Sequence, residues 1–201
     1  MKVIVVTGGI GSGKSEVCRI LKDMGFCAQY NADMRAKALY DEHPALLSDI
    51  EDALKCGLRD ETGRFQPRML AEKIFSDRRS LEIVEAHLFP VMMNDFESFA
   101  NSSGEDVVVF ESATILEKPQ FEGFADKVIL VDAPFETRLD RASRRDGAER
   151  EAVLARMNNQ KLMNALSDGY TDPRIDAVIQ NDSTIEELEN NTRKIINSLI
   201  L

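Results

Sequence analysis

The stretch VIVVTGGIGSGKSEVCRIL, residues 3–21, decides the fold of this chain. It begins with four β-branched residues, continues as a glycine-rich turn, and ends in an apolar-periodic segment that favours a helix. Within it, residues 8–15 (GGIGSGKS) match the pattern G-x-x-x-x-G-K-[ST] at every fixed position. A strand, a glycine-rich loop and a helix in this order are typical of a loop that binds phosphate groups.

The chemistry of a phosphate-binding loop (P-loop) explains this composition. Glycines let successive backbone N–H groups point inward as an anion-binding nest at a helix N-terminus. Lys14 is expected to reach the outer phosphates of a nucleoside triphosphate, and the Ser15 hydroxyl to bind Mg²⁺. The match is too complete for an ordinary glycine-rich turn with a solvated lysine. The expected ATP-binding residues of the loop are Gly9, Ile10, Gly11, Ser12, Gly13, Lys14 and Ser15.

The rest of the chain alternates predicted strands and helices. The strands are expected at residues 3–7, 27–31, 107–111, 127–132 and 177–180. The helices are expected at residues 14–24, 32–42, 45–55, 67–75, 79–100, 136–145, 148–166 and 184–199, the last opening with a Ser183-x-x-Glu186 capping box. This alternation predicts a parallel sheet with helices on both faces.

The spacing of these elements predicts one α/β domain over residues 1–201: a three-layer P-loop NTPase core with a five-stranded parallel sheet and two helical insertions. The core comprises residues 1–31, 101–135 and 170–201. About 70 nearly all-helical residues, 32–100, are too many for one crossover and form the first insertion. An arginine-rich segment at about 136–169 forms the second, a helical lid.

Composition excludes several classes of partner. A net charge of −10 disfavours nucleic acid and anionic membranes as partners. The apolar runs, of about five residues, are too short to cross a bilayer, and we expect no secretory signal. Three cysteines without C-x-x-C spacing favour thiols that form no disulfide in a reducing compartment, and therefore a cytoplasmic protein. We expect the protein to be a monomer or a weak homo-oligomer.

A P-loop alone does not decide the function. A GTPase carries N-K-x-D after a late strand, and a transporter ATPase carries an L-S-G-G-Q-type signature; neither occurs in this sequence. Small-molecule kinases are therefore favoured by elimination. Asp33 follows the second predicted strand at the sheet edge that faces the ligand. It fits a general base for a hydroxyl acceptor, and it fits a helix cap about equally well.

Two further groups of charged residues fit phosphoryl transfer. Glu111 ends an apolar strand, VVVFE, where a carboxylate would help to hold Mg²⁺, with an exposed strand-end acid as the alternative. Arg138, Arg141 and Arg145 share one helix face and suggest a lid that closes on phosphates, with a solvated face as the alternative. Arg144 fits the solvated alternative, paired within the helix with Asp140.

Taken together, the motifs resemble the dephospho-coenzyme A kinase family from end to end. After TGGIGSGKS, the segments that carry the resemblance are NAD at 31–33, ETGRFQPRMLAEKIFSD at 61–77, FESATILE at 110–117, ETRLDRASRRDG at 136–147, RMNNQ at 156–160 and IDAVIQND at 175–182. The resemblance implies ATP-dependent phosphorylation of the ribose 3′-hydroxyl of dephospho-CoA, the last step of CoA synthesis, with Mg²⁺ and a helical CoA-binding insertion.

The resemblance also implies site residues. Asp33 falls on the family's general base, and Arg141 and Arg145 fall on its lid arginines. Arg68 and Glu117 match positions near the acceptor, and Asn181 matches the loop beside the adenine of ATP.

The chain departs from the family pattern at four positions. Asn31 replaces the first Asp of D-A-D, Glu111 replaces an Asp, Ala113 replaces a proline, and Phe89 stands where the family has histidine before Pro90. Two other readings stay open from the residues: another small-molecule or nucleoside monophosphate kinase, and a non-catalytic nucleotide-dependent switch. Measuring ATP turnover with dephospho-CoA, AMP and shikimate as acceptors distinguishes these two readings from a dephospho-CoA kinase.

Overall fold

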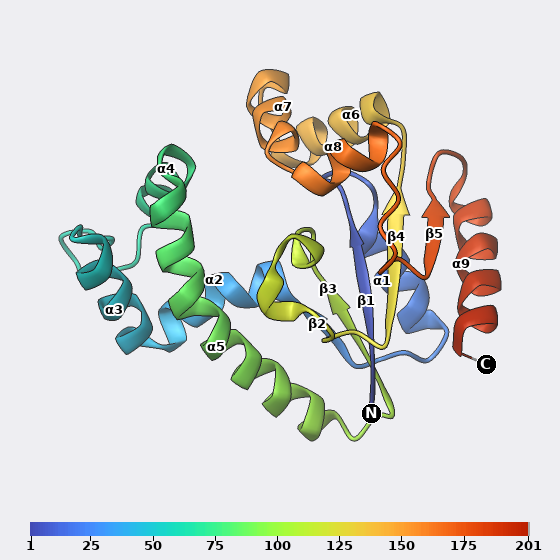
Figure 1. The fold of residues 1–201 in the computed structure, drawn as a ribbon, viewed down its shortest axis with the longest axis horizontal. Coiled ribbons are helices and arrows are strands. Elements are labelled where there is room, and N and C mark those ends of the chain that lie inside the picture. The colour runs from blue at the N-terminus through green and yellow to red at the C-terminus, as the bar shows by residue number, and fades with distance from the viewer. Residues whose placement is uncertain (201) are drawn as a thin grey trace. The chain divides into compact units, whose positions relative to one another are not determined.

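The computed structural model describes residues 1–200, apart from the side chains of residues 75, 76 and 200 (Figure 1). The described chain divides into two compact units. The first joins Met1–Asn31 to the segment from Gly104 onward, and the second is Ala32–Ser103.

A five-stranded parallel sheet forms the centre of the first unit. Its strands are β1 (Lys2–Gly8), β2 (Gln29–Asn31), β3 (Val107–Glu111), β4 (Lys127–Asp132) and β5 (Ala177–Gln180), in the order β2-β3-β1-β4-β5. β1 lies in the middle, with Val6 in register with Glu111 of β3 and with Ile129 of β4. The predicted parallel sheet is confirmed, and the P-loop leaves its central strand.

Both faces of the sheet are covered, because successive residues of a strand point to opposite sides. On one face, Ile4 and Val6 pack in a core with residues of α1 (Lys14–Asp23) and α9 (Ile185–Ile200). On the other face, Phe110 stacks on Tyr30 at 5.3 Å between ring centroids and contacts Phe121 and Phe124. Phe121 is the last residue of the short 3₁₀ helix η2 (Pro119–Phe121), which follows another, η1 (Ile115–Glu117).

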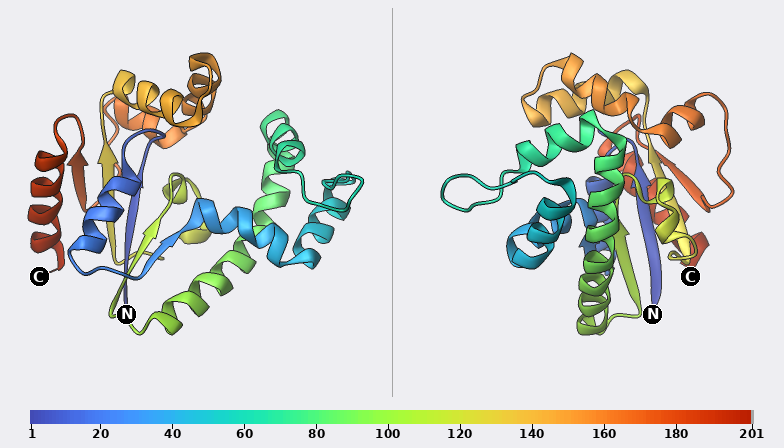
Figure 2. Two further views of the ribbon diagram at one scale, coloured as in Figure 1. Left: turned by 180° about the vertical axis from the view of Figure 1, so that it is seen from behind. Right: turned by 60° about the vertical axis from the view of Figure 1, so that its left-hand side comes forward.

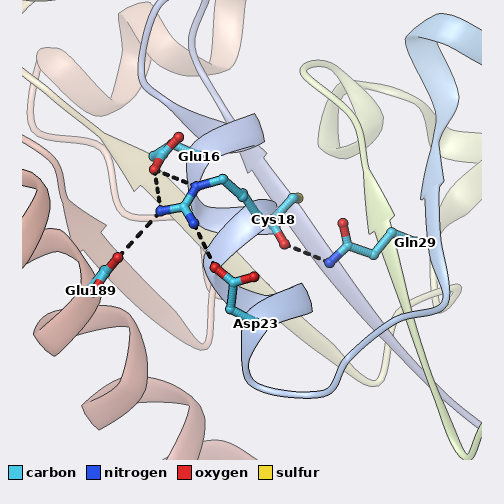
Figure 3. A network of polar contacts seen from close by, with 6 residues as sticks. Glu16, Cys18, Asp23, Gln29 and Glu189 are labelled. Carbon is cyan, nitrogen blue, oxygen red and sulfur yellow. Dashed lines mark hydrogen bonds and ion pairs between the residues drawn. The ribbon is translucent and has the colours of Figure 1, made fainter.

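Helix α1 is tied to its neighbours by the polar contacts of Figure 3. Arg19 bonds Glu16 and Asp23 within the helix and reaches Glu189 of α9 at 3.3 Å. The Gln29 amide of β2 donates to the Cys18 carbonyl at 2.6 Å. The ion pairs are exposed and add little stability, so the buried apolar core supplies most of the attachment.

Three helices lie between β4 and β5 in the chain: α6 (Phe135–Asp146), α7 (Arg150–Asn158) and α8 (Lys161–Ser167). Figures 1 and 2 show them beyond the carboxyl ends of the strands, the edge at which the P-loop also lies. In an open parallel sheet, this is the edge that binds ligands.

The second unit is helical, with α2 (Ala32–Glu42), α3 (Pro44–Leu54), α4 (Pro67–Ser76) and α5 (Arg78–Ser103). Arg35 of α2 donates to both oxygens of Asp95 in α5, at 2.9 and 2.7 Å. The Tyr40 ring packs on Phe65 at 4.8 Å, and its burial raises the pKa of the Tyr40 hydroxyl to about 12. These contacts hold α2, α5 and the 59–65 turn together.

Two local predictions were wrong. The helix expected over 148–166 is interrupted, because Gln160 leaves helical geometry at φ −84°, ψ 86° and caps α8 while its side chain bonds the P-loop. The predicted capping box at Ser183 is displaced by one residue: the Thr184 hydroxyl accepts the Glu187 N–H at 3.2 Å. Thr184-x-x-Glu187 has the same pattern, so the sequence offered two registers.

Candidate functional site

The P-loop depends on three glycines in backbone conformations that other residues rarely adopt. Gly8, Gly11 and Gly13 have φ values of 148°, 75° and 98°. The carbonyl of Gly13 accepts the N–H groups of Glu16 and Val17, which starts α1. The first N–H groups of a helix have no partner within it, so the α1 N-terminus is a site for anions.

The same glycines are packed from outside. An added Cβ at Gly8 would collide with the Val131 carbonyl, and one at Gly11 with the Arg138 carbonyl. At Gly13 it would collide with the Asn181 amide. The loop therefore needs glycine here both for its dihedral angles and for close approach of its neighbours.

Polar side chains from two later segments support the loop. Gln160 accepts the Ile10 N–H at 2.8 Å, and the buried Asn181 amide donates to the Ser12 carbonyl at 2.8 Å. Arg141 in turn donates to the Asn181 carbonyl at 3.0 Å. The sequence had indicated Asn181 only through the family resemblance, and Gln160 only as one letter of a matching segment.

The two P-loop residues with functional side chains already have partners in this structure. The Lys14 ammonium donates to the carbonyls of Gly8 and Gly9, at 3.1 and 3.2 Å. The Ser15 hydroxyl donates to Oε1 of Glu111 at 2.7 Å. Glu111 is therefore at the P-loop, as expected for an acid at the end of β3.

Two side chains donate to the Glu111 carboxylate, Ser15 and Asn31. The Asn31 amide donates to its Oε2 at 2.7 Å, because Asn31 and Glu111 are directly in register at the ends of β2 and β3. Burial, followed by the negative charge of Glu111, raises the pKa of the Cys18 thiol. Cys18 is therefore protonated, and it forms no disulfide with the other described cysteines.

The donor set suits a hard divalent cation. Mg²⁺ takes oxygen ligands and few from protein, since phosphates and water supply the rest. The Ser15 hydroxyl and the Glu111 carboxylate supply such oxygens side by side at the P-loop. Over the described residues there is no cluster of three or more His, Cys, Asp or Glu that would hold a metal by itself.

The arginines predicted to share one face of α6 lie in three different environments. Arg138 is buried beside the P-loop, Arg141 bonds Asn181, and Arg145 bonds Asp146 at 2.7 Å. Arg144 is exposed, but its expected partner Asp140 is bonded by Arg150 of α7 instead. The tertiary contact with α7 replaces the predicted intrahelical pair.

The other candidate residues are spread over both units. Glu117 of η1 accepts the Leu162 N–H at 2.9 Å and so caps the first turn of α8. In the second unit, Asp33 is exposed in the first turn of α2, and Arg68 pairs with Glu72 while remaining 89% exposed. Sequence reasoning did not foresee the capping contact of Glu117, which joins residues 45 positions apart.

No described helix has a long enough apolar stretch to span a bilayer.

Comparison with solved structures gives the fold. A Thermus thermophilus protein of known crystal structure matches with a TM-score of 0.82 at 28% identity, covering 100% of this chain and 98% of that one. A dephospho-CoA kinase from Campylobacter jejuni matches with a TM-score of 0.64 at 24% identity, covering 98% and 97%. A shikimate kinase from Acinetobacter baumannii shares the fold at 15% identity and a TM-score of 0.53, covering 100% and 93%.

Comparison with curated proteins gives the family. The dephospho-CoA kinase of Porphyromonas gingivalis is 37% identical over 172 residues, 86% of this chain and 84% of that protein. That of Deinococcus radiodurans is 34% identical over 191 residues, covering 92% and 86%. The family model described as dephospho-CoA kinase matches residues 2–187. With its P-loop on the central strand of a five-stranded parallel sheet, this chain belongs to the dephospho-CoA kinase family.

Proposed function

We propose that this protein transfers the γ-phosphoryl group of ATP to the ribose 3′-hydroxyl of dephospho-CoA, giving CoA in the final step of CoA biosynthesis. The observation that carries the proposal is a complete P-loop, hydrogen-bonded by Gln160 and Asn181, in a chain that matches the family model from residue 2 to residue 187. The fold alone would not suffice, because shikimate kinases share it.

The P-loop binds the polyphosphate of ATP. Its backbone N–H groups, together with those at the start of α1, hold the phosphate oxygens. Lys14 exchanges the carbonyls of Gly8 and Gly9 for the outer phosphates, which gives its ammonium an ionic partner in place of two neutral ones. The P-loop residues Gly9–Ser15 and Asn181, which supports them, form the ATP site.

Ser15 and Glu111 would hold Mg²⁺, which neutralises phosphate charge during transfer. Asn31 fixes the orientation of the Glu111 carboxylate by donating to it, and Ser15 donates to the same carboxylate from α1. This shell of donors is built from β2 and α1, so the Glu111 side chain is oriented before any ligand binds.

Asp33 is the proposed general base. It accepts the proton of the acceptor hydroxyl as that oxygen attacks the γ-phosphorus of ATP. The bond from the γ-phosphorus to the β–γ bridging oxygen breaks, and this oxygen leaves with ADP. The carboxylate is exposed in the first turn of α2, where a substrate hydroxyl can reach it. We propose that Arg68 and Glu117 lie near the acceptor and that the helical unit binds the CoA portion of that acceptor. Residues 136–169 are proposed to act as a lid.

Arg141 and Arg145 are the proposed lid arginines, which stabilise charge on the transferring group and exclude water. In this structure Arg141 bonds the Asn181 carbonyl and Arg145 bonds Asp146. Both contacts lie on a partly exposed surface, so each arginine can exchange its partner for a phosphate oxygen. We further propose that the reaction takes place in the cytoplasm, in keeping with three free thiols, and that the protein is a monomer or weak homo-oligomer.

The test is turnover of ATP with dephospho-CoA, AMP and shikimate side by side, with Mg²⁺ present. We expect turnover with dephospho-CoA alone, and a product that carries its new phosphate on the ribose 3′-oxygen. Lys14→Ala serves as the control and should lose nearly all activity while keeping its fold. Turnover with AMP or shikimate instead, or ATP binding without transfer, would refute the proposal.

A further inference from the structure

The guanidinium of Arg138 is a buried cation beside the P-loop. The residue is only 4% exposed. A Cβ added to Gly9 would collide with a terminal nitrogen of Arg138, and one added to Gly11 would collide with the Arg138 carbonyl. The turn of α6 that carries Arg138 therefore lies directly against the loop.

Within the described part of the chain, this cation has neither a hydrogen-bond acceptor nor an ion-pair partner. Its Nε is buried without a partner, and no described carboxylate oxygen lies within the 4.0 Å of an ion pair. Among the described side chains, the favourable contact to this charge is the ring of Phe135, with 5.7 Å between Cζ and the ring centroid. Burial lowers the pKa of Arg138, and the charge of Asp132 opposes this effect without a direct contact.

An unpaired buried cation destabilises a folded protein, because water no longer solvates the charge. Around the same loop, Asn181 and Arg141 have partners, and the Gln160 amide oxygen is bonded while its nitrogen is buried without a partner. Arg138 differs from these side chains because the group left without a partner carries a full charge. What the loop binds is a polyanion, and its charge acts strongly on a cation held in a water-poor setting. The compensating charge for Arg138 would thus arrive with the nucleotide.

We propose that Arg138 is an electrostatic part of the nucleotide site: a fixed, unpaired guanidinium that raises the affinity for polyphosphates and lowers the stability of the nucleotide-free protein. The inference rests on the proposed ATP-binding function. It separates Arg138 from Arg141 and Arg145, which are bonded to exchangeable partners and are proposed to act in the moving lid. Arg138 acts from a fixed position, because its turn is packed on the loop.

The test replaces the cation by an apolar side chain of similar length, Arg138→Met. Binding of ATP, ADP, AMP and adenosine is measured by calorimetry without acceptor, and thermal unfolding is measured without nucleotide. We expect the dissociation constant of ATP to rise about tenfold or more. The loss should shrink as phosphates are removed and fall within about twofold for adenosine, which has no charge to attract.

The stability of the nucleotide-free variant should move in the opposite direction. Removing a buried, unpaired charge should leave its thermal midpoint unchanged or raise it by roughly 2–6 °C. Arg138→Lys, which keeps a charge, should retain the preference for ATP over adenosine. Arg144→Met, on the same helix but exposed, is the matched control and should change neither quantity.

An equal loss of affinity for all four ligands would show that Arg138 merely packs the loop and would overturn the proposal. So would a fall in the thermal midpoint or a failure of Arg138→Met to fold, because both contradict the predicted destabilising charge. If the wild-type protein binds ATP but does not phosphorylate dephospho-CoA, the proposed function fails while this inference stands.

Discussion

At the scale of single residues, the most informative position is Asp33, in the first turn of α2. A carboxylate in the first turn of a helix can stabilise that helix, and an exposed carboxylate can also accept a proton. Asp33→Asn keeps the shape of the side chain but removes the proposed base. We expect kcat with dephospho-CoA to fall by about 10²–10⁴-fold, with ATP affinity and thermal stability nearly unchanged.

Single-turnover kinetics and equilibrium ATP binding on Asp33→Asn distinguish the two roles. Asp41→Asn, an exposed acid on the same helix, is the control and should retain normal chemistry. Near-normal single-turnover rates in Asp33→Asn would leave Asp33 only a structural role in the first turn of α2.

Asn31 provides a second test at the residue scale. Its amide orients Glu111 at 2.7 Å, so Asn31→Leu keeps the volume and leaves Oε2 of Glu111 without this donor. We expect the Mg²⁺ concentration for half-maximal ATP binding to rise by about 10–100-fold, as for other residues that orient a metal ligand. In a Glu111→Gln background, the same substitution should add little, because the group that it orients is gone. Additive effects of the two changes would contradict the positioning role.

At the scale of elements, α6 is divided between support of the P-loop and the proposed lid. Arg138 and Arg141 contact the loop and Asn181, whereas Arg145 bonds Asp146, which also receives Arg156 of α7 at 2.7 Å. The first turns of the helix are thus attached to the core, and its last turn is attached to α7. A closing motion of the proposed lid would therefore either release the Arg141 bond to Asn181 or bend α6 beyond Arg141.

A comparison of three variants tests the lid. Arg141→Ala and Arg145→Ala should each lower kcat by roughly one to three orders of magnitude, at most the effect of an arginine finger. Arg144→Ala, exposed on the adjoining face, should do little. Rapid-quench rates at saturating ATP measure these effects, and equal losses at all three positions would indicate general surface charge.

At the scale of the whole molecule, net charge and ion pairs set the response to acid. A hydrogen bond from Arg145, followed by one from Arg156, lowers the pKa of Asp146 to about 2. The depressed pKa means that this pair stabilises the fold above the carboxyl's unfolded value, near 4, and that its contribution is lost as the pH falls toward 2. Hydrogen bonds from Arg174 to Asp172 lower the pKa of that buried carboxyl in the same direction.

We therefore expect the free energy of unfolding to fall between about pH 4 and pH 2, as both carboxylates become protonated. Asp146→Asn should remove about 1 kcal/mol of that dependence, after allowance for the exposure of Arg145. Urea unfolding at a series of pH values measures it. A pH profile of Asp146→Asn that matches the wild type across this interval would contradict the assignment.

The sequence by itself determined the features that depend on local patterns. Five strands were predicted, the clearest from continuous apolar runs and a weaker one at 27–31, and three of the five have the predicted bounds. A run such as 127–132 is readable in the sequence because a strand covered on both faces is apolar at nearly every position. The P-loop was readable because its glycines occupy left-handed conformations that few other residues adopt. The order of the motifs was enough to identify the family, which the comparisons confirm.

Only the tertiary structure decided which side chains meet. Gln160 breaks a predicted helix because its amide accepts an N–H 150 positions earlier, and Arg150 takes the partner expected for Arg144. Arg138 shares a helix stripe with Arg141 and Arg145, yet it is buried and they are not, because the P-loop packs on one turn of that stripe alone. Helical periodicity tells which residues share a face, but only the elements packed on that face determine which of them lose their water.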